Sequence, residues 1–440
     1  MPLFGRKTSE EPAPLERTWD PLPPAPAPGP RGLRSVTDHR AYLLSCLEPL
    51  PPFRQSILDT LGLSICEDVH AGLDMPRFDN SAMDGYAVRA VDVADANPDS
   101  PVVLPVLGEV AAGQDALHRL APGTAIKIMT GAPLPPGADA IVPYEATDRG
   151  SSDVRVHAAS REGQHVRYVG EDIQTGSLLL SAGHQLGPRD VGLLAAVGRD
   201  AVLVRPKPRV AVVSTGSELV QPGQAFDNPH QIYDSNSYML AGAARAAGAE
   251  VYRVGLVSDD PDTVLQLIAD QLVRADLIIS TGGVSQGDYD VVKAVLPRIG
   301  ATDFAAVAMQ PGKPQVFGLI GEDRTPMIML PGNPVSAYVS FEAFVRPAIR
   351  TLMGLTPVTR TPVSCRVRHG FSSAPGKLQL ARGIVSLDEE GCSSVELAGG
   401  HGSHLLGDLA RANGLVVVPE DVEQVSAGED VEVWLLDEGY

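Results

Sequence analysis

The spacing of apolar and polar residues changes several times along the chain. Between residues 209 and 353, short apolar runs alternate with longer stretches in which apolar residues recur every three or four positions. The first spacing is typical of buried strands and the second of amphipathic helices. Strands that alternate with helices predict a parallel sheet covered by helices on both faces. The predicted strands are 209–214, 252–257, 277–280, 305–309 and 327–330, and the predicted helices are 235–248, 258–272, 290–296 and 334–353.

The sequences before residue 209 and after residue 353 show a different pattern of apolar and polar residues. Residues 71–167 contain four short apolar runs separated by Gly, Pro and Asp, which predicts a small β module. Valine-rich segments with Gly-containing turns predict a second β domain from about residue 357 onward. Helical patterns are expected over residues 36–47, 53–61 and 192–197. Residues 1–34 hold nine prolines and few apolar residues, so a disordered tail is expected there.

Composition and charge exclude some classes of function. The chain has 35 basic and 54 acidic residues, a net charge of −19, and so lacks the basic surplus that nucleic-acid binding needs. No apolar run is long enough to span a membrane, and no signal-peptide core is found, so we expect a cytoplasmic protein with no membrane partner. The four cysteines form no C-x-x-C or zinc-ligand spacing, and free thiols are expected.

Candidate chemistry gathers where the predicted strands end. Glycine-rich polar loops at 214–218, 280–290, 310–314 and 331–336 follow four of them. Ligands of open parallel sheets bind at the carboxyl ends of the strands, so these loops predict a site for a ligand with anionic groups.

Two of these loops have the clearest physical basis. In the last, Asn333 can cap the following helix, Pro334 suits its first position, and Ser336 lies in its first turn, where exposed N–H groups favour an oxyanion. An ordinary capped helix explains the same residues. In the 310–314 loop, a Pro-Gly turn presents Lys313, one of only six lysines, as a ligand contact.

Other motifs have weaker explanations. Neither a G-x-G-x-x-G fingerprint nor a P-loop is present, and the G-x-S-x-G at 283–287 lacks the helix and the histidine order of a hydrolase. Residues 76–87 hold Asp79, Ser81 and Asp84, which could bind a ligand or cap turns. His401 and His404 could ligate a metal, although a loop edge explains them better.

Eight motifs in one order carry a family resemblance. They are PRFDNSAMDGYAVR (76–89), IMTGAPLPPGAD (128–139), GEDI (170–173), STGSEL (214–219), STGGVSQGDYDVVK (280–293), MQPGKP (309–314), LPGNPVSA (330–337) and GHGSHLL (400–406). From about residue 36 to 437 the chain resembles the molybdopterin molybdenumtransferases, the MoeA family, which includes the E domain of gephyrin.

The resemblance implies a multidomain α/β plus β fold and a homodimer whose active site joins two chains. The central molybdopterin-binding α/β domain would contain the parallel sheet, and the C-terminal domain would be a small β-barrel. The implied units are a tail (1–34), an elongated split subdomain (35–70 and 168–205), an inserted β-rich subdomain (71–167), the α/β domain (206–353) and the C-terminal β domain (357–440).

The resemblance also implies the chemistry. Members insert molybdate into adenylylated molybdopterin with release of AMP, assisted by a divalent cation, usually Mg²⁺. The molybdopterin adenylyltransferase and recipient molybdoenzymes are candidate partners. Asp290 would hold the metal, and Asp290, Lys313 and Glu218 would be catalytic. The implied substrate-binding residues are Asp79, Ser81, Asp84, Thr130, Asp172, Ser285, Pro331, Pro334, Ser336, Arg382 and Ser403.

The sequence departs from many relatives at two positions. Gln310 replaces the first lysine of a KPGKP motif, and Lys377 stands where arginine is common. Losing the first lysine removes one positive charge from the expected molybdate site. The alternative from another class is a non-catalytic scaffold, and the presence of Asp290, Lys313 and Glu218 argues against it.

Overall fold

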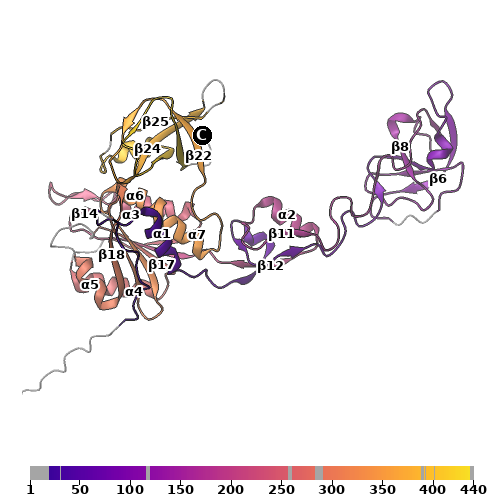
Figure 1. The fold of residues 1–440 in the computed structure, drawn as a ribbon. Coiled ribbons are helices and arrows are strands. Elements are labelled where there is room, and N and C mark those ends of the chain that lie inside the picture. Colours follow the sequence, from indigo (N-terminus) through magenta and orange to yellow (C-terminus); the bar gives the residue numbers. More distant parts are fainter. Residues whose placement is uncertain are drawn as a thin grey trace, which may run out of the picture.

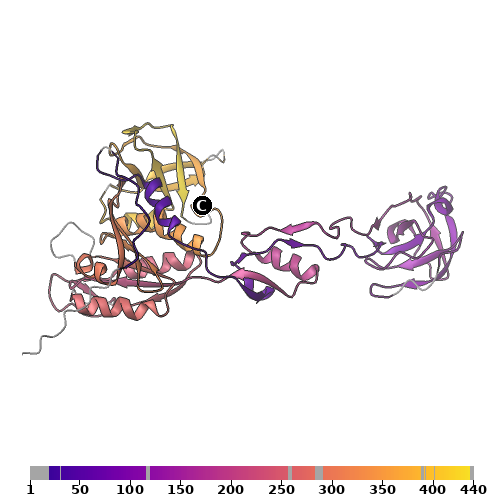
Figure 2. The ribbon, with the colours of Figure 1, turned by 60° about the horizontal axis from the view of Figure 1, so that its bottom comes forward.

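The structure is a computed structural model, and it describes residues 19–29, 31–114, 119–255, 260–282, 291–387, 391, 393–400 and 402–436. The described chain forms a two-domain body, a narrow arm and a distal module at the far end of the arm (Figure 1). The rotated view in Figure 2 shows the same extended arrangement. Within these residues, no helix is long and apolar enough to cross a membrane.

The body is built on a six-stranded sheet in the order β16-β13-β17-β21-β20-β18. The first four strands are parallel, as the sequence predicts, whereas β20 runs antiparallel to both β21 and β18. The sequence analysis missed β20 and began β18 too late. The bounds are β16 (Glu250–Arg253), β13 (Arg209–Ser214), β17 (Leu277–Thr281), β21 (Thr325–Leu330), β20 (Pro314–Ile320) and β18 (Gly300–Ala306).

Helices cover both faces of this sheet. One apolar core joins the sheet to α1, α3 and the long helical segment that follows β21, and a second core joins the opposite face to α4 and α5. The Asp260 carboxylate caps α4 by accepting a hydrogen bond from the Thr263 N–H (2.9 Å). The bounds are α1 (Val36–Ser45), α3 (Asn236–Ala246), α4 (Pro261–Leu272), α5 (Val291–Ile299) and α6 (Pro334–Ser340), which continues through a π-helical turn, η4 (Phe341–Val345), into α7 (Arg346–Leu352).

The second domain of the body is a closed five-stranded barrel. Its strands follow the order β24-β25-β22-β28-β26, and β26 pairs back with β24 to close it. A short strand of the preceding domain, β19, adds to β24 in parallel and so couples the two domains. The bounds are β19 (Met309–Gln310), β22 (Pro362–Val367), β23 (Phe371–Ser372), β24 (Leu378–Leu387), β25 (Ser393–Leu397), α8 (Leu406–Arg411), β26 (Gly414–Val418), β27 (Gln424–Val425) and β28 (Asp430–Leu435).

The arm combines two separate chain segments around a small apolar core. The prediction of a helix over residues 53–61 is wrong, because residues 53–56 pair as a strand with residues 201–204 and only a 3₁₀ turn follows. That pairing joins residues far apart in the chain, which local periodicity does not reveal. The bounds are β1 (Phe53–Ser56), η1 (Ile57–Thr60), β2 (Ser64–Ile65), β3 (Val69–His70), β11 (Leu178–Leu180), α2 (Pro188–Ala196) and β12 (Ala201–Arg205).

The distal module is a five-stranded sheet in the order β8-β5-β7-β6-β9, consistent with the predicted β module. Its core contains Tyr86, whose hydroxyl donates to the Gly150 carbonyl (2.9 Å). The bounds are β4 (Asn80–Ser81), β5 (Gly85–Val88), η2 (Ala90–Val93), β6 (Val102–Val110), β7 (Ala125–Ile128), β8 (Ala140–Pro143), η3 (Tyr144–Ala146), β9 (Asp153–Val156) and β10 (Val166–Arg167).

The described part of the N-terminal segment lies against the body, in contrast to the disordered tail that composition suggests. Leu22 packs against the main core, and the Tyr42 hydroxyl donates to the Pro23 carbonyl (3.2 Å). Arg34 is only 7% exposed and pairs with Asp303. Residues 19–29 and 31–34 therefore make specific contacts with the body.

Candidate active site

The larger cavity of the site lies at the carboxyl edge of the parallel strands, as the loop positions predict. It measures about 410 Å³ and is walled by the loops after β13, β17 and β21. Two short strands that pair with each other, β14 (Leu219–Val220) and β15 (Ile232–Tyr233), add a further wall. Residues His404 and Leu406 of the barrel domain complete the lining. The cavity is therefore formed by two domains.

Buried polar contacts fix the walls of this cavity. The Asn236 amide donates to the Thr281 hydroxyl (3.0 Å) and the Gly332 carbonyl (2.7 Å), which ties two loops together. Asp234 is buried and accepts hydrogen bonds from the Ser237 N–H (3.0 Å) and from two hydroxyls. Gly282 has φ +92°, and a Cβ there would lie 2.6 Å from the Thr215 carbonyl. The sequence analysis missed Asp234, which lies just before α3, and Asn236, which is the first residue of α3.

Glu218 is the exposed carboxylate that lines the larger cavity. Its side chain folds back over Gly216, where a Cβ would lie 2.8 Å from the carboxylate oxygens. Glycine at this position therefore allows the carboxylate to reach the cavity. The structure places this predicted catalytic residue at the predicted edge of the sheet.

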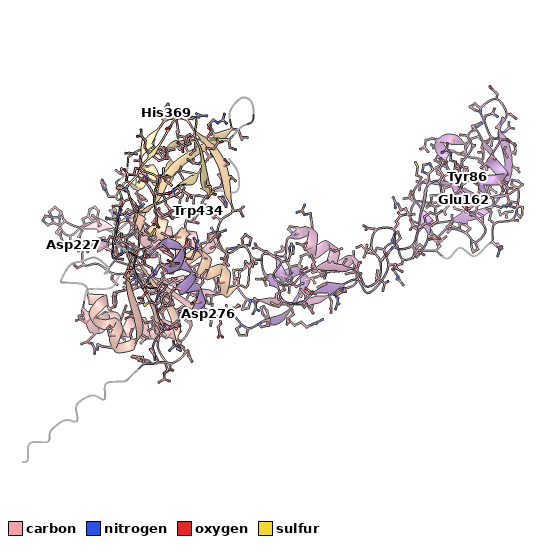
Figure 3. The ribbon with its side chains drawn as sticks, in the orientation of Figure 1. Tyr86, Glu162, Asp227, Asp276, His369 and Trp434 are labelled. Carbon is pink, nitrogen blue, oxygen red and sulfur yellow. The ribbon has the colours of Figure 1, made fainter. Side chains whose placement is uncertain are left out.

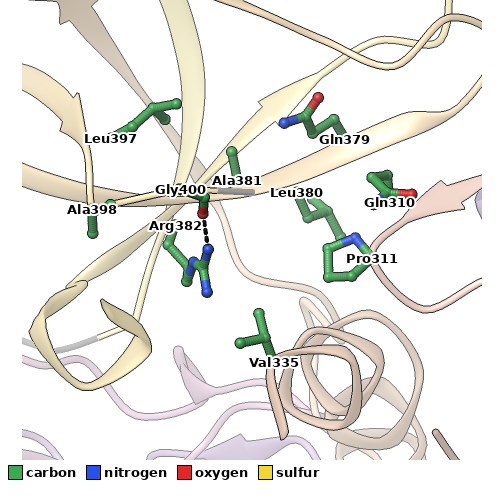
Figure 4. A pocket seen from close by; sticks show the side chains of 11 residues that line it. Gln310, Pro311, Val335, Gln379, Leu380, Ala381, Arg382, Leu397, Ala398 and Gly400 are labelled. Atoms are coloured by element: carbon green, nitrogen blue, oxygen red, sulfur yellow. Dashed lines mark hydrogen bonds between the residues drawn. The ribbon is translucent and has the colours of Figure 1, made fainter. Parts of the chain in front are cut away.

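A second, smaller cavity of about 30 Å³ lies next to the first, between the α/β domain and the barrel (Figure 4). Gln310, Pro311 and Val335 line one side, and residues 379–382 and 397–400 of the barrel line the other. A space of this size accommodates a small ion but not a nucleotide. Both cavities reach the start of α6, since Asn333 and Pro334 line the larger one and Val335 the smaller.

Hydrogen bonds from the buried Gln315 side chain fix the loop that carries Lys313. The buried Gln315 amide donates to the Gly312 carbonyl (2.7 Å) and to the Ser340 hydroxyl on α6 (2.7 Å). Gly312 has φ +104°, and a Cβ there would lie 2.6 Å from the Ser340 hydroxyl oxygen, so glycine is required. Lys313 itself is exposed, and its ammonium has no ion-pair partner among the described residues.

Arg382 holds the barrel loop against the start of α6. Its guanidinium donates to the carbonyls of Gly402 and Leu405 (3.1 Å each) and of Gly400. Burial lowers the pKa of Arg382, and the nearby Asp408 opposes that shift. The Ser403 carbonyl accepts a hydrogen bond from the Val335 N–H (3.1 Å). The predicted residues Arg382 and Ser403 thus lie together beside the smaller cavity.

The start of α6 differs in one detail from the sequence prediction. Pro334 occupies the first turn as predicted, but the Asn333 side chain makes no capping hydrogen bond, and only its carbonyl bonds to the Ala337 N–H (2.9 Å). Ser336 is 5% exposed in the first turn. The Pro331 carbonyl is buried nearby and accepts from the Thr281 hydroxyl (3.3 Å).

The remaining predicted residues lie in the distal module and where it joins the arm. The Asp84 carboxylate accepts from the Thr130 N–H (2.7 Å) and hydroxyl (2.9 Å), and these two hydrogen bonds lower the pKa of Asp84. Asp79 accepts from the Val169 N–H (2.8 Å). Ser81 is buried, and Asp172 is exposed.

One chain does not bring the two groups of predicted residues together. Figure 3 labels Tyr86 in the distal module and Asp276 in the body, at opposite ends of the arm. Ser285 and Asp290 lie outside the described residues. Among the residues whose positions are described, no group of three His, Cys, Asp or Glu side chains could hold a metal ion.

The fold and the two cavities define an α/β ligand-binding domain whose site is completed by a β-barrel. Three family descriptions match in order: "MoeA N-terminal region (domain I and II)" over residues 34–198, "Probable molybdopterin binding domain" over 211–351, and "MoeA C-terminal region (domain IV)" over 365–436. The chain therefore belongs to the MoeA family of molybdopterin molybdenumtransferases, which confirms the resemblance carried by the eight motifs.

Individual relatives match over nearly their whole length. Molybdopterin molybdenumtransferase 2 of Mycobacterium tuberculosis is 44% identical over 408 residues, which cover 91% of this chain and 99% of the relative. Molybdopterin molybdenumtransferase of Nostoc sp. is 39% identical and covers 84% of this chain and 85% of the relative. The crystal structure of a molybdopterin biosynthesis MoeA protein from Pyrococcus horikoshii superposes with a TM-score of 0.76 at 32% identity, covering 93% of this chain and 100% of that structure.

Proposed function

We propose that this protein inserts molybdate into adenylylated molybdopterin, releases AMP and yields molybdenum cofactor, in the cytoplasm. The observation that carries the proposal is the pair of adjoining cavities at the start of α6. A large space beside a space for a small ion suits a reaction in which a phosphorylated pterin and an oxyanion must meet. Relatives named molybdopterin molybdenumtransferase support the same assignment.

The larger cavity would hold the pterin phosphate and the adenylate. Its polar lining supplies hydroxyl and amide groups together with the Glu218 carboxylate. At the start of α6, Pro334 has no N–H and the Val335 N–H donates to the Ser403 carbonyl, so Ser336 would supply the donors to a phosphate oxygen, with Pro331 and Pro334 shaping that wall. Ser285 is proposed to join this group from the loop after β17.

The smaller cavity would hold molybdate. Buried Arg382 would contribute positive charge on the barrel side, and the exposed Lys313 would contribute an ammonium from the loop whose residues Gln310 and Pro311 line the cavity. Ser403 lies on the loop that Arg382 holds. Gln310 lines this cavity where many relatives have lysine, so a single lysine serves the oxyanion in this protein.

The proposal includes a divalent cation, Mg²⁺, at the phosphoanhydride. The described residues that line the larger cavity include the oxygen donors Glu218, Ser214 and Thr215, and none of the described lining residues is a cysteine. Hard oxygen donors of this kind fit Mg²⁺, which commonly binds through one or two carboxylates and substrate phosphates. Asp290 is the proposed carboxylate ligand. When bound, the cation would supply positive charge to the phosphate oxygens.

A homodimer would complete this site. The motif that contains Asp79, Ser81 and Asp84, together with Thr130 and Asp172, lies far from the cavities of its own chain (Figure 1). We propose that these residues face the cavities of a second chain related by two-fold symmetry. The molybdopterin adenylyltransferase and the recipient molybdoenzymes are proposed as partners that deliver the substrate and accept the product.

Mixing two inactive variants tests the shared site. At a molybdate concentration close to the half-saturating value of the wild type, we expect Asp79→Asn and Lys313→Ala each to lose most turnover as homodimers. After unfolding and refolding together, half of the dimers are mixed, and each mixed dimer holds one intact site, so roughly a quarter of wild-type turnover should return. Two Lys313→Ala preparations mixed in the same way provide the control. A monomer by light scattering, or no recovery of turnover, would refute the shared site.

The turnover assay tests the reaction itself. Purified protein is incubated with adenylylated molybdopterin, Mg²⁺ and molybdate, and AMP and active cofactor are measured. Asp290→Asn keeps the size of the side chain but removes the charge that would hold the cation. Substrate should still bind to this variant while AMP release falls sharply. Substrate binding without AMP release by the wild-type protein would instead indicate a non-catalytic scaffold.

A further inference from the structure

Arg34 forms a largely buried ion pair with Asp303. Its guanidinium donates to both carboxylate oxygens of Asp303 on β18 (2.6 and 3.2 Å). The side chains of the pair are 9% and 14% exposed. His39 lies 3.1 Å from the same guanidinium, which also stacks over the Tyr42 ring at 5.4 Å from its centroid. A bidentate pair of this kind fixes orientation as well as distance.

The backbone of Arg34 extends the sheet at the point where β18 ends. The Arg34 N–H donates to the Ala306 carbonyl (2.8 Å), and the Arg34 carbonyl accepts from the Ala308 N–H (2.7 Å). Together these bonds form a parallel bridge opposite Val307. We call residues 31–34 the N-terminal strap.

This bridge lies at the base of the loop that carries Lys313. The Val307 N–H donates to the Lys313 carbonyl (2.8 Å), which closes the loop directly on the residue opposite Arg34. The Ala308 carbonyl accepts from the Leu378 N–H of the barrel (2.9 Å). A shift of the strap would therefore move both ends of the 307–313 loop.

The strap also contacts the other wall of the smaller cavity. The Arg31 guanidinium donates to the Pro375 carbonyl (2.9 Å), in the turn before β24. β24 continues through Gln379 and Arg382, which line the cavity opposite Gln310. One short segment thus touches the structures on both sides of the smaller cavity.

We propose that the N-terminal strap, through Arg34, is a positioning element that fixes the 307–313 loop and thereby sets the affinity for molybdate. This inference rests on the proposed function of Lys313 in the same site. Arg34 does not touch the proposed reacting groups, since its guanidinium contacts Asp303, His39 and the Tyr42 ring. It acts through the backbone bridge that places Lys313 and Gln310.

A control pair lies at the amino ends of two inner strands of the sheet, and its arginine is more exposed than Arg34. Arg209 and Asp276 form another bidentate pair, with donor–acceptor distances of 2.8 and 3.1 Å, at the amino ends of β13 and β17. Removing that guanidinium also breaks an Arg–Asp pair but leaves the strap and the loop intact. Arg34→Met and Arg209→Met can therefore be compared directly, and Arg34→Lys tests rescue by a cation that lacks the planar fork.

Two measurements test the inference. In the turnover assay, Arg34→Met should raise the molybdate concentration for half-maximal rate about tenfold, because small displacements of a binding group are costly. The half-saturating concentration of adenylylated molybdopterin should stay within twofold of wild type. Arg34→Lys should recover part of the difference, and Arg209→Met should show no change. Amide hydrogen exchange of the peptide 307–313 should accelerate in Arg34→Met only.

The outcomes separate this inference from the proposed function. Unchanged exchange of residues 307–313 in Arg34→Met would overturn the positioning role even if the wild-type enzyme is active. An equal rise in both half-saturating concentrations would also overturn it, since that result indicates general damage. Faster exchange in a protein that releases no AMP with molybdate would support the mechanical role of the strap and refute the proposed reaction instead. If Arg34→Met does not fold, the molybdate titration and the hydrogen-exchange measurement are both made on Arg34→Lys.

Discussion

Replacing Lys313 with alanine should weaken molybdate binding without disturbing the fold. The Lys313 side chain is exposed and has no ion-pair partner among the described residues, so its removal breaks no described internal contact. The loop keeps its shape because its anchors are the Gln315 amide and the Gly312 and Lys313 carbonyls, which the substitution retains. The melting temperature should therefore stay close to that of the wild type.

The size of the effect follows from the charge of the ligand. A hydrogen bond between a charged donor and an anion contributes about 1.5–3 kcal/mol. At 1.4 kcal/mol per tenfold, the half-saturating molybdate concentration should rise roughly ten- to a hundredfold in Lys313→Ala. Gln310→Lys should lower it by a smaller factor. The added charge lines the same cavity as the buried guanidinium of Arg382, and the longer side chain loses rotamer freedom.

The assay is a molybdate titration of AMP release by the wild-type protein and both variants. Lys207→Ala removes another exposed lysine, at a distance from the cavities, and serves as the control for net charge. Raising the ionic strength should reduce the difference between wild type and Lys313→Ala, since exposed charges are screened by salt. Identical half-saturating concentrations for wild type, Lys313→Ala and Gln310→Lys would show that molybdate binds elsewhere.

Three further predictions concern stability. Glu342 is 4% exposed and pairs with Arg360 at 2.7 Å. Glu342→Gln should therefore lower the free energy of unfolding, measured in urea, by about 3–5 kcal/mol. Disrupting the exposed Arg366–Asp430 pair is the control and should lower it by less than about 1 kcal/mol. Burial, and then the charge of Arg34, lower the pKa of His39 from 6.5 to about 4. The stability that neutral His39 contributes is therefore complete above pH 6.5 and is lost as the pH falls toward 4. Between these pH values, the melting temperature of His39→Gln should decline less than that of the wild type. Deleting residues 1–18 should leave the melting temperature and turnover unchanged, whereas deleting residues 1–34 also removes the contacts of Arg34 and should lower both.

Local sequence determined the parallel part of the α/β domain and the β character of the two flanking regions. The alternation of apolar runs with three- and four-residue spacing places the four parallel strands and the helices between them, because side-chain periodicity depends only on the geometry of neighbouring residues. The same alternation places the glycine-rich loops at the carboxyl edge, where Glu218 and Pro334 lie in the larger cavity. Eight ordered motifs were enough to identify the family.

Tertiary structure decided the features that depend on residues far apart in the chain. Residues 53–56 became a strand only because residues 201–204 pair with them, and β20 entered the sheet antiparallel, which no local spacing indicates. The smaller cavity exists because Gln310 and Arg382, from two domains, line the same space, and the strap is held because Arg34 reaches Asp303. Composition predicted that Arg34 belongs to a disordered tail, because a charged residue next to a proline-rich segment is usually exposed to solvent. Burial of that arginine became favourable only when folding supplied a carboxylate and open backbone groups beside it.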